Sequence, residues 1–326
     1  MGNKRVFYAC QGLMLNGKPL YGVQNLSIST TQNTNVVENW GSLAISGVPV
    51  DTPRCNINIS RTLAEADKDS KSDAKGKYGP IETGSLEALA TRHNHNLCVF
   101  FVKDTADGVN TEYKKAHPRS DVKSIGFRDV SINSISYTIN VDGFLQEDVE
   151  MIAFNKEYDP TGLCQIAEMD LGEEDYTIMG NPIKREHFNS IELGEKVPDN
   201  IIQSIDISIP FNIQTVDEFG TFVSRHSNRY RFPTLPIKST LSATVIYQNT
   251  ADFDNYMFRE SGVLCGVKPT DFPKSTGLSI STCFDFGVDL GNCILENIEY
   301  EGGDTSGGNA TLTYQYSCYN SGNING

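Results

Sequence analysis

Two histidines, His93 and His95, flank Asn94 at the end of a predicted helix, and imidazole nitrogens are frequent zinc ligands. A structural zinc site needs four ligands, and no third candidate lies near these two in the sequence. We therefore expect both histidines to cap the end of the helix in solvent and to bind no metal.

A second candidate is the polar run 67–73, DKDSKSD, which begins like the oxygen ligands of a calcium-binding loop. The pattern fails at its sixth position, where Ser72 replaces the glycine of the sharp turn. It fails again at the twelfth position, where Tyr78 replaces the chelating glutamate. The run is therefore predicted to be a solvated loop of mixed charge.

Two further clusters contain residue types found in catalytic sites. Residues 303–308, GDTSGG, are similar to the loop around a nucleophilic serine, but the spacing differs by one residue. The carboxylates of Glu173, Glu174 and Asp175 have no basic or cysteine residue nearby to complete a site. No glycine-rich phosphate loop precedes a helix. The sequence thus predicts that the protein is not an enzyme and has no catalytic, cofactor or metal site.

The composition is that of a globular protein with room for two domains. The chain has 326 residues, of which 38% are hydrophobic and 21% are charged. Its longest apolar run, residues 97–102, is the size of a strand and far shorter than the ~20 residues of a membrane helix. The first residues lack the apolar stretch of a signal peptide. We expect no membrane segment.

The charge and the cysteines narrow the class of partner. The chain has 27 basic and 41 acidic residues, and its net charge of −14 argues against binding nucleic acid through phosphate neutralisation. Acidity of this kind keeps a protein soluble, and it also suits a surface that faces DNA without gripping it. The eight cysteines form no C-x-x-C pair, so they are predicted to be free thiols in a reducing cytoplasm.

Alternation of apolar and polar residues predicts that strands dominate the structure. Leu26 and Ile28 point to one side of a strand, while the neighbouring serines point to the other. The same alternation recurs in residues 55–60, 132–141 and 311–316.

Each half of the chain also contains one segment with helical spacing. These segments are residues 85–93, with Ser85 as the N-cap, and residues 251–259. The predicted fold class is α+β and mainly β, with antiparallel strands in a sandwich or barrel and one flanking helix per half.

An internal repeat outweighs every other signal. Residues 23–41 align without a gap with residues 202–220. The ends of the two halves match as well, because each has a long strand, a turn and a closing strand, with Ile-x-Tyr triplets at 135–137 and 298–300. We therefore expect two tandem modules, residues 1–155 and 201–326, joined by an acidic linker or insertion at 156–200. The identical pairs in the repeat are Gln24/Gln203, Ile28/Ile207, Ser29/Ser208, Asn33/Asn212, Val37/Val216 and Gly41/Gly220.

Two long loops follow the first strand of each module, at residues 31–52 and 210–233. Both lack clear periodicity and both carry large apolar side chains, which a monomer would expose. Burial against a neighbouring molecule is the better explanation for these side chains. The predicted contact residues are Trp40, Leu43, Ile45, Phe219, Phe222 and Phe232.

Residues 22–63 contain an ordered motif, with a Gln-x-apolar-x-Ile-Ser strand, an asparagine, a Gly-x-Leu segment and a proline before the next strand. This order resembles the N-terminal region of tail tube and related virion structural proteins of tailed bacteriophages. The chain departs from that family in its duplication, because many tube proteins carry one module per chain. The motif positions here are Gln24, Leu26, Ile28, Ser29, Asn33, Gly41, Leu43 and Pro53.

The resemblance implies a β-sandwich or barrel module whose strands join those of its neighbours into a continuous ring. It also implies that the two long loops reach into the adjacent ring, and that double-stranded DNA passes through the lumen without specific binding. Two modules per chain imply trimeric rings with six quasi-equivalent positions. The expected partners are copies of the chain and other phage tail proteins, and the expected location is the virion, assembled in the host cytoplasm.

Three alternatives remain open at the level of sequence. A baseplate hub or distal tail protein would share the module but form a single ring. An enzyme on a two-domain β scaffold would need a catalytic constellation, which the sequence lacks. A host-binding adhesin would stay monomeric and bind a glycan.

Overall fold

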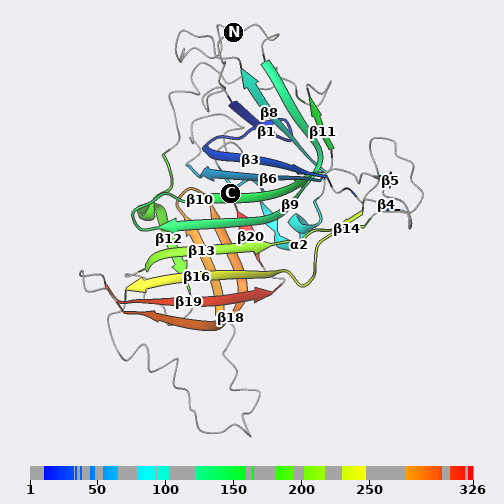
Figure 1. Ribbon diagram of the computed structural model, residues 1–326. Coiled ribbons are helices and arrows are strands. Elements are labelled where there is room, and N and C mark those ends of the chain that lie inside the picture. Colours follow the sequence, from blue (N-terminus) through cyan, green and yellow to red (C-terminus); the bar gives the residue numbers. More distant parts are fainter. Residues whose placement is uncertain are drawn as a thin grey trace.

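The computed structural model describes residues 11–32, 34, 37–38, 45–47, 54–64, 79–92, 94–102, 122–153, 155–158, 164, 181–193, 202–216, 230–246, 276–302, 309–319 and 322–325. This part of the chain is mainly β, as predicted, and its principal feature is one large antiparallel sheet. The longest path through the sheet follows the order β12-β17-β18-β19-β16-β13-β9-β10-β6-β3, and Figure 1 shows the strands from β3 to β18 lying one below the other. Their bounds are β3 Val23–Thr31, β6 Arg54–Thr62, β9 Val122–Asn140, β10 Gln146–Ala153, β12 Phe188–Glu192, β13 Ile202–Pro210, β16 Lys238–Ile246, β17 Thr276–Thr282, β18 Gly287–Glu301 and β19 Thr311–Tyr319.

The period-2 pattern of the sequence produces strands with one buried and one polar face. In β6, Cys55, Ile57 and Ile59 are buried while the side chains between them are half-buried or exposed. The predicted strand at residues 132–141 is part of β9, a single strand of 19 residues. Its length lets β9 pair with different strands along its first and second halves.

Shorter strands extend the sheet beside the long strands. The first half of β9 pairs with β8 (His95–Val102) and β11 (Asn155–Tyr158). The first half of β18 pairs with β17 and with β20 (Asn323–Asn325), which in turn pairs with β7 (Gly84–Ser85). Beyond β8 lie β1 (Gln11–Leu15) and β2 (Lys18–Pro19).

The segment 156–200, predicted to be a linker or insertion, contributes to the sheet where it is described. It contains most of β11, the 3-10 helix η4 (Arg185–His187) and β12, which pairs with β17. Its acidic residues Glu173, Glu174 and Asp175 lie outside the described residues.

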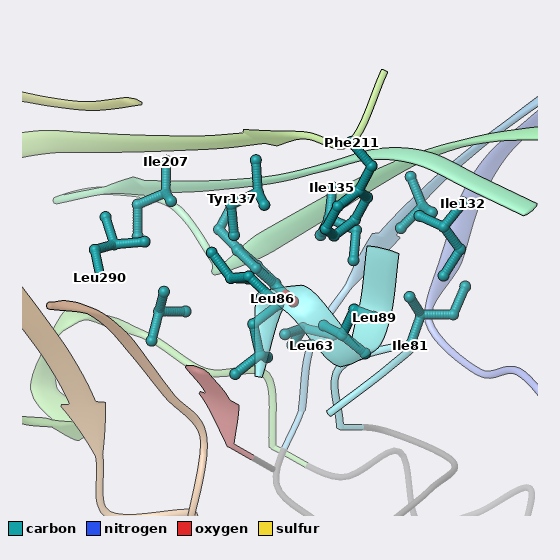
Figure 2. Packing of buried hydrophobic residues seen from close by; sticks show 14 of the residues in the cluster. Leu63, Ile81, Leu86, Leu89, Ile132, Ile135, Tyr137, Ile207, Phe211 and Leu290 are labelled. Atoms are coloured by element: carbon teal, nitrogen blue, oxygen red, sulfur yellow. The ribbon is translucent and has the colours of Figure 1, made fainter. Parts of the chain in front are cut away.

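A helix predicted at residues 85–93 is confirmed but is shorter, since α2 spans Leu86–Ala90. The Ser85 side chain caps it by accepting a hydrogen bond from the backbone amide of Ala88 at 3.3 Å. Leu86 and Leu89 point from the helix into the core beneath the sheet, towards Tyr137 and Ile135 (Figure 2). The second predicted helix, residues 251–259, lies outside the described residues.

The expectation of free thiols throughout is wrong for four of the eight cysteines. Disulfides join Cys98 to Cys164 and Cys293 to Cys318. Cys293 and Cys318 are direct partners across β18 and β19, with their Cα atoms 4.2 Å apart. The sequence does not reveal this pair, because only the register of β18 and β19 brings the two residues together.

A buried ion pair holds β6, β10 and the segment before α2 together. Arg61 and Glu147 are register partners without exposed side chains, and Arg61 Nε lies 3.2 Å from Glu147 Oε2. The same carboxylate accepts hydrogen bonds from Tyr137 Oη at 3.0 Å and from the amide of Ile81 at 2.9 Å, while Arg61 donates to the carbonyl of Gly79. Burial raises the pKa of Glu147, and the charge of Arg61 acts in the opposite direction.

The other half of the sheet has an apolar pair at the corresponding place. Arg61 lies opposite Val23 and Glu147, whereas Val245 lies opposite Ile202 and Leu312. Val23 and Ile202 are equivalent in the sequence repeat. The chain therefore contains its own apolar alternative to the buried ion pair.

We expect Glu147→Leu alone to lower the free energy of unfolding by about 3–5 kcal/mol, because it leaves the Arg61 charge buried without its counter-ion. The double variant Arg61→Val/Glu147→Leu removes both charges and should be more stable than the single variant. Urea unfolding followed by circular dichroism measures both. A double variant no more stable than the single variant would contradict this account.

Candidate functional site

The two halves of the sheet meet where β9 pairs with β13. Seven residue pairs form this junction, from Ser204 opposite Asn140 to Pro210 opposite Ser134. On its inner face Ile205, Ile207 and Ile209 lie opposite Ile139, Tyr137 and Ile135, and all six side chains are buried. Burying an isoleucine contributes about 1.5–3 kcal/mol, so this face alone makes the junction a strong contact.

Backbone hydrogen bonds at both ends fix the register of the junction. The amide of Val141 donates to the carbonyl of Gln203 at 2.9 Å, and the amide of Phe211 donates to the carbonyl of Asn133 at 2.8 Å. Hydrogen-bonded pairs alternate with closer, non-hydrogen-bonded pairs in an antiparallel ladder. Asp206/Thr138 and Ser208/Ser136 are therefore non-hydrogen-bonded pairs. The Thr138 hydroxyl donates to the Asp206 carboxylate at 2.9 Å across the first of them.

Asn133 receives the chain where it leaves β13. It is the extra residue of a bulge in β9, because Ser134 pairs with Glu150 and Ile132 pairs with Met151. Its carbonyl accepts hydrogen bonds from the amides of Phe211 and Asn212, at 2.8 and 3.3 Å. Its side-chain oxygen accepts one from the amide of Ile213 at 3.1 Å. Three successive amides thus converge on one residue.

The strand pairings of the two halves have irregularities at corresponding places. The β3–β6 pairing has a bulge between Val23 and Asn25, and the β13–β16 pairing has one between Ile202 and Ser204. These positions are aligned in the sequence repeat.

The closing hairpins share a second irregularity. In β18, Glu296 is skipped between Leu295 and Asn297, as Asn133 is skipped in β9. The triplets 135–137 and 298–300 each begin two residues after the bulge. Glu296 therefore occupies in β18 the place that Asn133 occupies in β9.

β9 pairs with β13 along its second half, but the corresponding edge of β18 has no such partner among the described strands. Among the strands that the structure describes, none pairs with the outer edge of β18 beyond Cys293 or with the outer edge of β3. Side-chain burial follows this difference. Ile205 and Ile207 are buried, whereas their aligned residues Leu26 and Ile28 are half-buried. Tyr137 is fully buried, and the corresponding Tyr300 is 53% exposed.

The bulge residue of β18 is held differently from Asn133. Lys238 Nζ lies 3.1 Å from Glu296 Oε1 and 3.2 Å from Oε2, and the Tyr319 hydroxyl donates to Oε1 at 3.4 Å. The hydrogen bond to Glu296 raises the pKa of Lys238. Both side chains are nearly half exposed, so solvent screens this ion pair and it adds little to stability.

The outer face of the sheet is polar across its width. Residues directly opposite one another share a face, so the registers define rows that cross the strands. In one such row every residue is exposed or half-buried and none is apolar or basic, and the same is true of a second row from β3 to β16. The complete row is Thr62, Gln146, Thr138, Asp206, Ser242, Gln315 and Asn297. The second row is polar through Asn25, Ser60, Asp148, Ser136, Ser208 and Thr240, and it continues on β19 and β18 through the buried Ser317 to the partly exposed Ile294.

The two loops predicted to lack secondary structure each contain a small antiparallel ribbon. In the first, β4 (Val37–Glu38) pairs with β5 (Ile45–Gly47). In the second, β14 (Gln214–Val216) pairs with β15 (Tyr230–Phe232). The expectation was wrong because strands of two or three residues are too short to show alternation. Arg231 fixes the second ribbon to β9 by donating to the Asp129 carbonyl and, at 2.6 Å, to the Ser131 hydroxyl.

The structure places only part of the predicted contact set. Phe232 ends β15 with 53% of its surface exposed, and the backbone of Ile45 begins β5. The predicted contact residues Trp40, Leu43, Phe219 and Phe222 lie outside the described residues.

The histidine prediction is wrong for His95, which is buried in β8 rather than solvated at a helix end. Its Nδ1 lies 3.0 Å from Asn16 Nδ2 and 3.3 Å from Glu82 Oε1, and burial lowers its pKa. His93 and the runs 67–73 and 303–308 lie outside the described residues. Within the described residues there is no group of three potential metal ligands and no helix long and apolar enough to span a membrane.

Sequence analysis missed Asn133 and Glu296. Neither belongs to a recognisable motif, and only the strand registers reveal their shared role as bulge residues. A scan against protein-family models finds no match for the chain, and a search of curated proteins also finds none.

We expect Asn133→Ala to lower the free energy of unfolding by about 1–3 kcal/mol, because the partly buried amide of Ile213 loses its acceptor. Asn140→Ala, at the exposed end of the same strand, is the matched control and should change it by less than about 0.5 kcal/mol. Chemical denaturation measures both. Equal losses in the two variants would show that the side chain of Asn133 is not an anchor.

Proposed function

We propose that the chain is a structural subunit of a phage tail tube, built from two tandem copies of one strand module. The observation that carries this proposal is the agreement of the two halves in register. The bulges at Val23/Asn25 and Ile202/Ser204, and those at Asn133 and Glu296, fall at corresponding positions. A regular sheet needs no bulges, so the recurrence of both kinds of bulge in the two halves supports duplication of a module and not a chance likeness of strands.

The arrangement of the modules supports ring assembly. The long strand β9 of the first module pairs with β13, the first strand of the second, and among the described strands this leaves one open edge on β3 and one on β18 beyond Cys293. Unlike edges on one chain generate a head-to-tail contact, which closes into a ring when the rotation allows it. Open edges are also a liability in a monomer, and pairing with another copy removes it.

A trimeric ring would form a closed barrel around a channel. Eight strands from each of three chains make 24 strands, counting β3, β6, β10, β9, β13, β16, β19 and β18. At ~4.8 Å per strand the circumference is about 115 Å and the diameter about 37 Å, before strand tilt widens it. The polar outer face would line this channel, because the opposite face is the apolar core covered by α2 (Figure 2).

The chemistry of that face suits the passage of DNA. Its complete row contains hydroxyls, amides and the carboxylate of Asp206, and the polar part of the second row adds that of Asp148. Neither contains a lysine or arginine to bind phosphate. A surface of this kind repels the phosphate backbone weakly and offers no site at which it would be retained. In this proposal the loops that carry the ribbons β4–β5 and β14–β15 contact an adjacent ring.

The test is the state of assembly of the purified chain. We expect rings of about 108 kDa, three times the 35.9 kDa chain, in sedimentation velocity, and stacks of rings in negative-stain images. A view down the ring axis should show six similar lobes. Single rings that never stack would favour a hub or distal tail protein, and a monomer at all concentrations would overturn the proposal.

Phe232 provides a test of stacking. We expect Phe232→Ser to shorten the tubes severalfold while leaving the mass of the ring unchanged, because it removes an exposed aromatic ring from the β14–β15 ribbon. Tyr158→Ser, at a residue that is 72% exposed on β11, is the control and should leave tube length unchanged. Tube lengths are measured on electron micrographs. Tubes of full length from the Phe232 variant would exclude that side chain from the contact.

A further inference from the structure

We infer that β3 of one chain pairs with β18 of a second copy in the register of the β9–β13 junction, and that Glu296 receives the chain that leaves β3. The inference rests on the proposed assembly into rings, and it specifies which edges meet and how. It needs no new contact type, because one chain already contains the same junction between its own two modules.

The register follows from two correspondences. Residues of β3 correspond to those of β13 through the sequence repeat, so Ser29 takes the place of Ser208. Residues of β18 correspond to those of β9 through the bulge, so Glu299, three residues after Glu296, takes the place of Ser136, three residues after Asn133. Since Ser208 lies opposite Ser136, Ser29 should lie opposite Glu299.

The same register brings compatible side chains together. On the inner face Ile28 would lie opposite Tyr300, as Ile207 lies opposite Tyr137. Ile28 is half-buried and Tyr300 is 53% exposed in the single chain, so pairing would remove apolar surface from water.

On the polar face Ser27 would lie opposite Glu301, where the in-chain junction has the hydrogen-bonded pair Thr138 and Asp206. A hydroxyl and a carboxylate meet at this position in both junctions, with the strands that carry them exchanged. The in-chain pair spans 2.9 Å, which shows that the geometry of this position permits the hydrogen bond.

Glu296 is suited to the role that Asn133 has in the in-chain junction. Asn133 accepts three amides with its carbonyl and side-chain oxygens as the chain leaves β13. Glu296 has a carbonyl and a carboxylate at the corresponding bulge, and in the single chain the carboxylate accepts from Lys238 on β16 and Tyr319 on β19. To serve as the anchor it would turn from these partners to the open edge of β18. The amides that follow β3, beginning with that of Gln32, would reach it. A carboxylate accepts from backbone amides more strongly than a neutral amide oxygen does.

Lys238 provides the simpler explanation of Glu296, as one half of a surface ion pair. That explanation accounts for the charge of Glu296 but not for its position at a bulge equivalent to that of Asn133. The two explanations predict different effects when Lys238 is removed, and the second experiment below uses this difference.

The first experiment tests the register with the double variant Ser29→Cys/Glu299→Cys. The two positions form a non-hydrogen-bonded pair in the inferred junction, where Cα atoms approach to about 4.5 Å. Within one chain they lie seven strands apart, about 34 Å along the sheet, so a disulfide between them must join two molecules. We expect mild oxidation to convert most of the protein into linked dimers and trimers on non-reducing gels.

The matched control is Asn25→Cys/Glu299→Cys, which keeps both residues on the same face but shifts one by four positions, about 14 Å. It should cross-link at least tenfold less, and each single cysteine variant sets the background from native thiols such as the exposed Cys283. Rings that form without a preference for the Ser29/Glu299 pair would overturn the register and leave the proposed function intact. A chain that stays monomeric would overturn both.

The second experiment tests the anchor. We expect Glu296→Ala to weaken ring assembly about tenfold per junction, as loss of a charge-assisted hydrogen bond predicts. Lys238→Ala removes the ion pair but keeps the carboxylate, so it should change assembly by less than twofold. Sedimentation over a range of concentrations measures both, and circular dichroism confirms that each variant is folded. Equal weakening by the two variants would show that Glu296 acts only through Lys238.

Discussion

The constraint on which the structure depends is the change of partner along one edge of β9. A strand of 19 residues pairs with β8 along its first half and with β13 along its second. The bulge at Asn133 lies between the two pairings, and its oxygen atoms satisfy the amides of the chain that leaves β13. Without such a residue, three successive amides near the core would have no acceptor. A single irregularity therefore lies where the two halves of the sheet meet.

The two halves solve the same packing problem with different chemistry. Arg61, Glu147 and Tyr137 form a buried polar group in one half, and Val245 and Leu312 fill the corresponding place in the other. A buried ion pair gives little net stability, but it ties its neighbours to one arrangement. Here it holds the chain segment that enters α2, through the Gly79 carbonyl and the Ile81 amide. The two halves share the registers of their strands but bury different side chains at this place. What they have in common is therefore the backbone pairing and not the composition of the core.

Much of the sheet could be predicted from the sequence, because alternation is a local signal. The strands around Ile28 and Ile57, and the helix capped by Ser85, are visible in short windows. The disulfide between Cys293 and Cys318 and the anchoring role of Asn133 were not, since both depend on register between distant strands. The ribbons in the long loops were missed for a different reason, because two or three residues per strand give no period.

A ring of such chains would have two kinds of junction with one geometry. The covalently connected junction places a carboxylate on β13 opposite a hydroxyl on β9, and the inferred one places a hydroxyl on β3 opposite a carboxylate on β18. Connected edges are held at a high effective concentration by the chain itself, so their side chains need to supply specificity only. Edges of separate molecules must also overcome the cost of association. A charged acceptor at Glu296, where the connected junction has the neutral Asn133, is the difference expected from that additional demand.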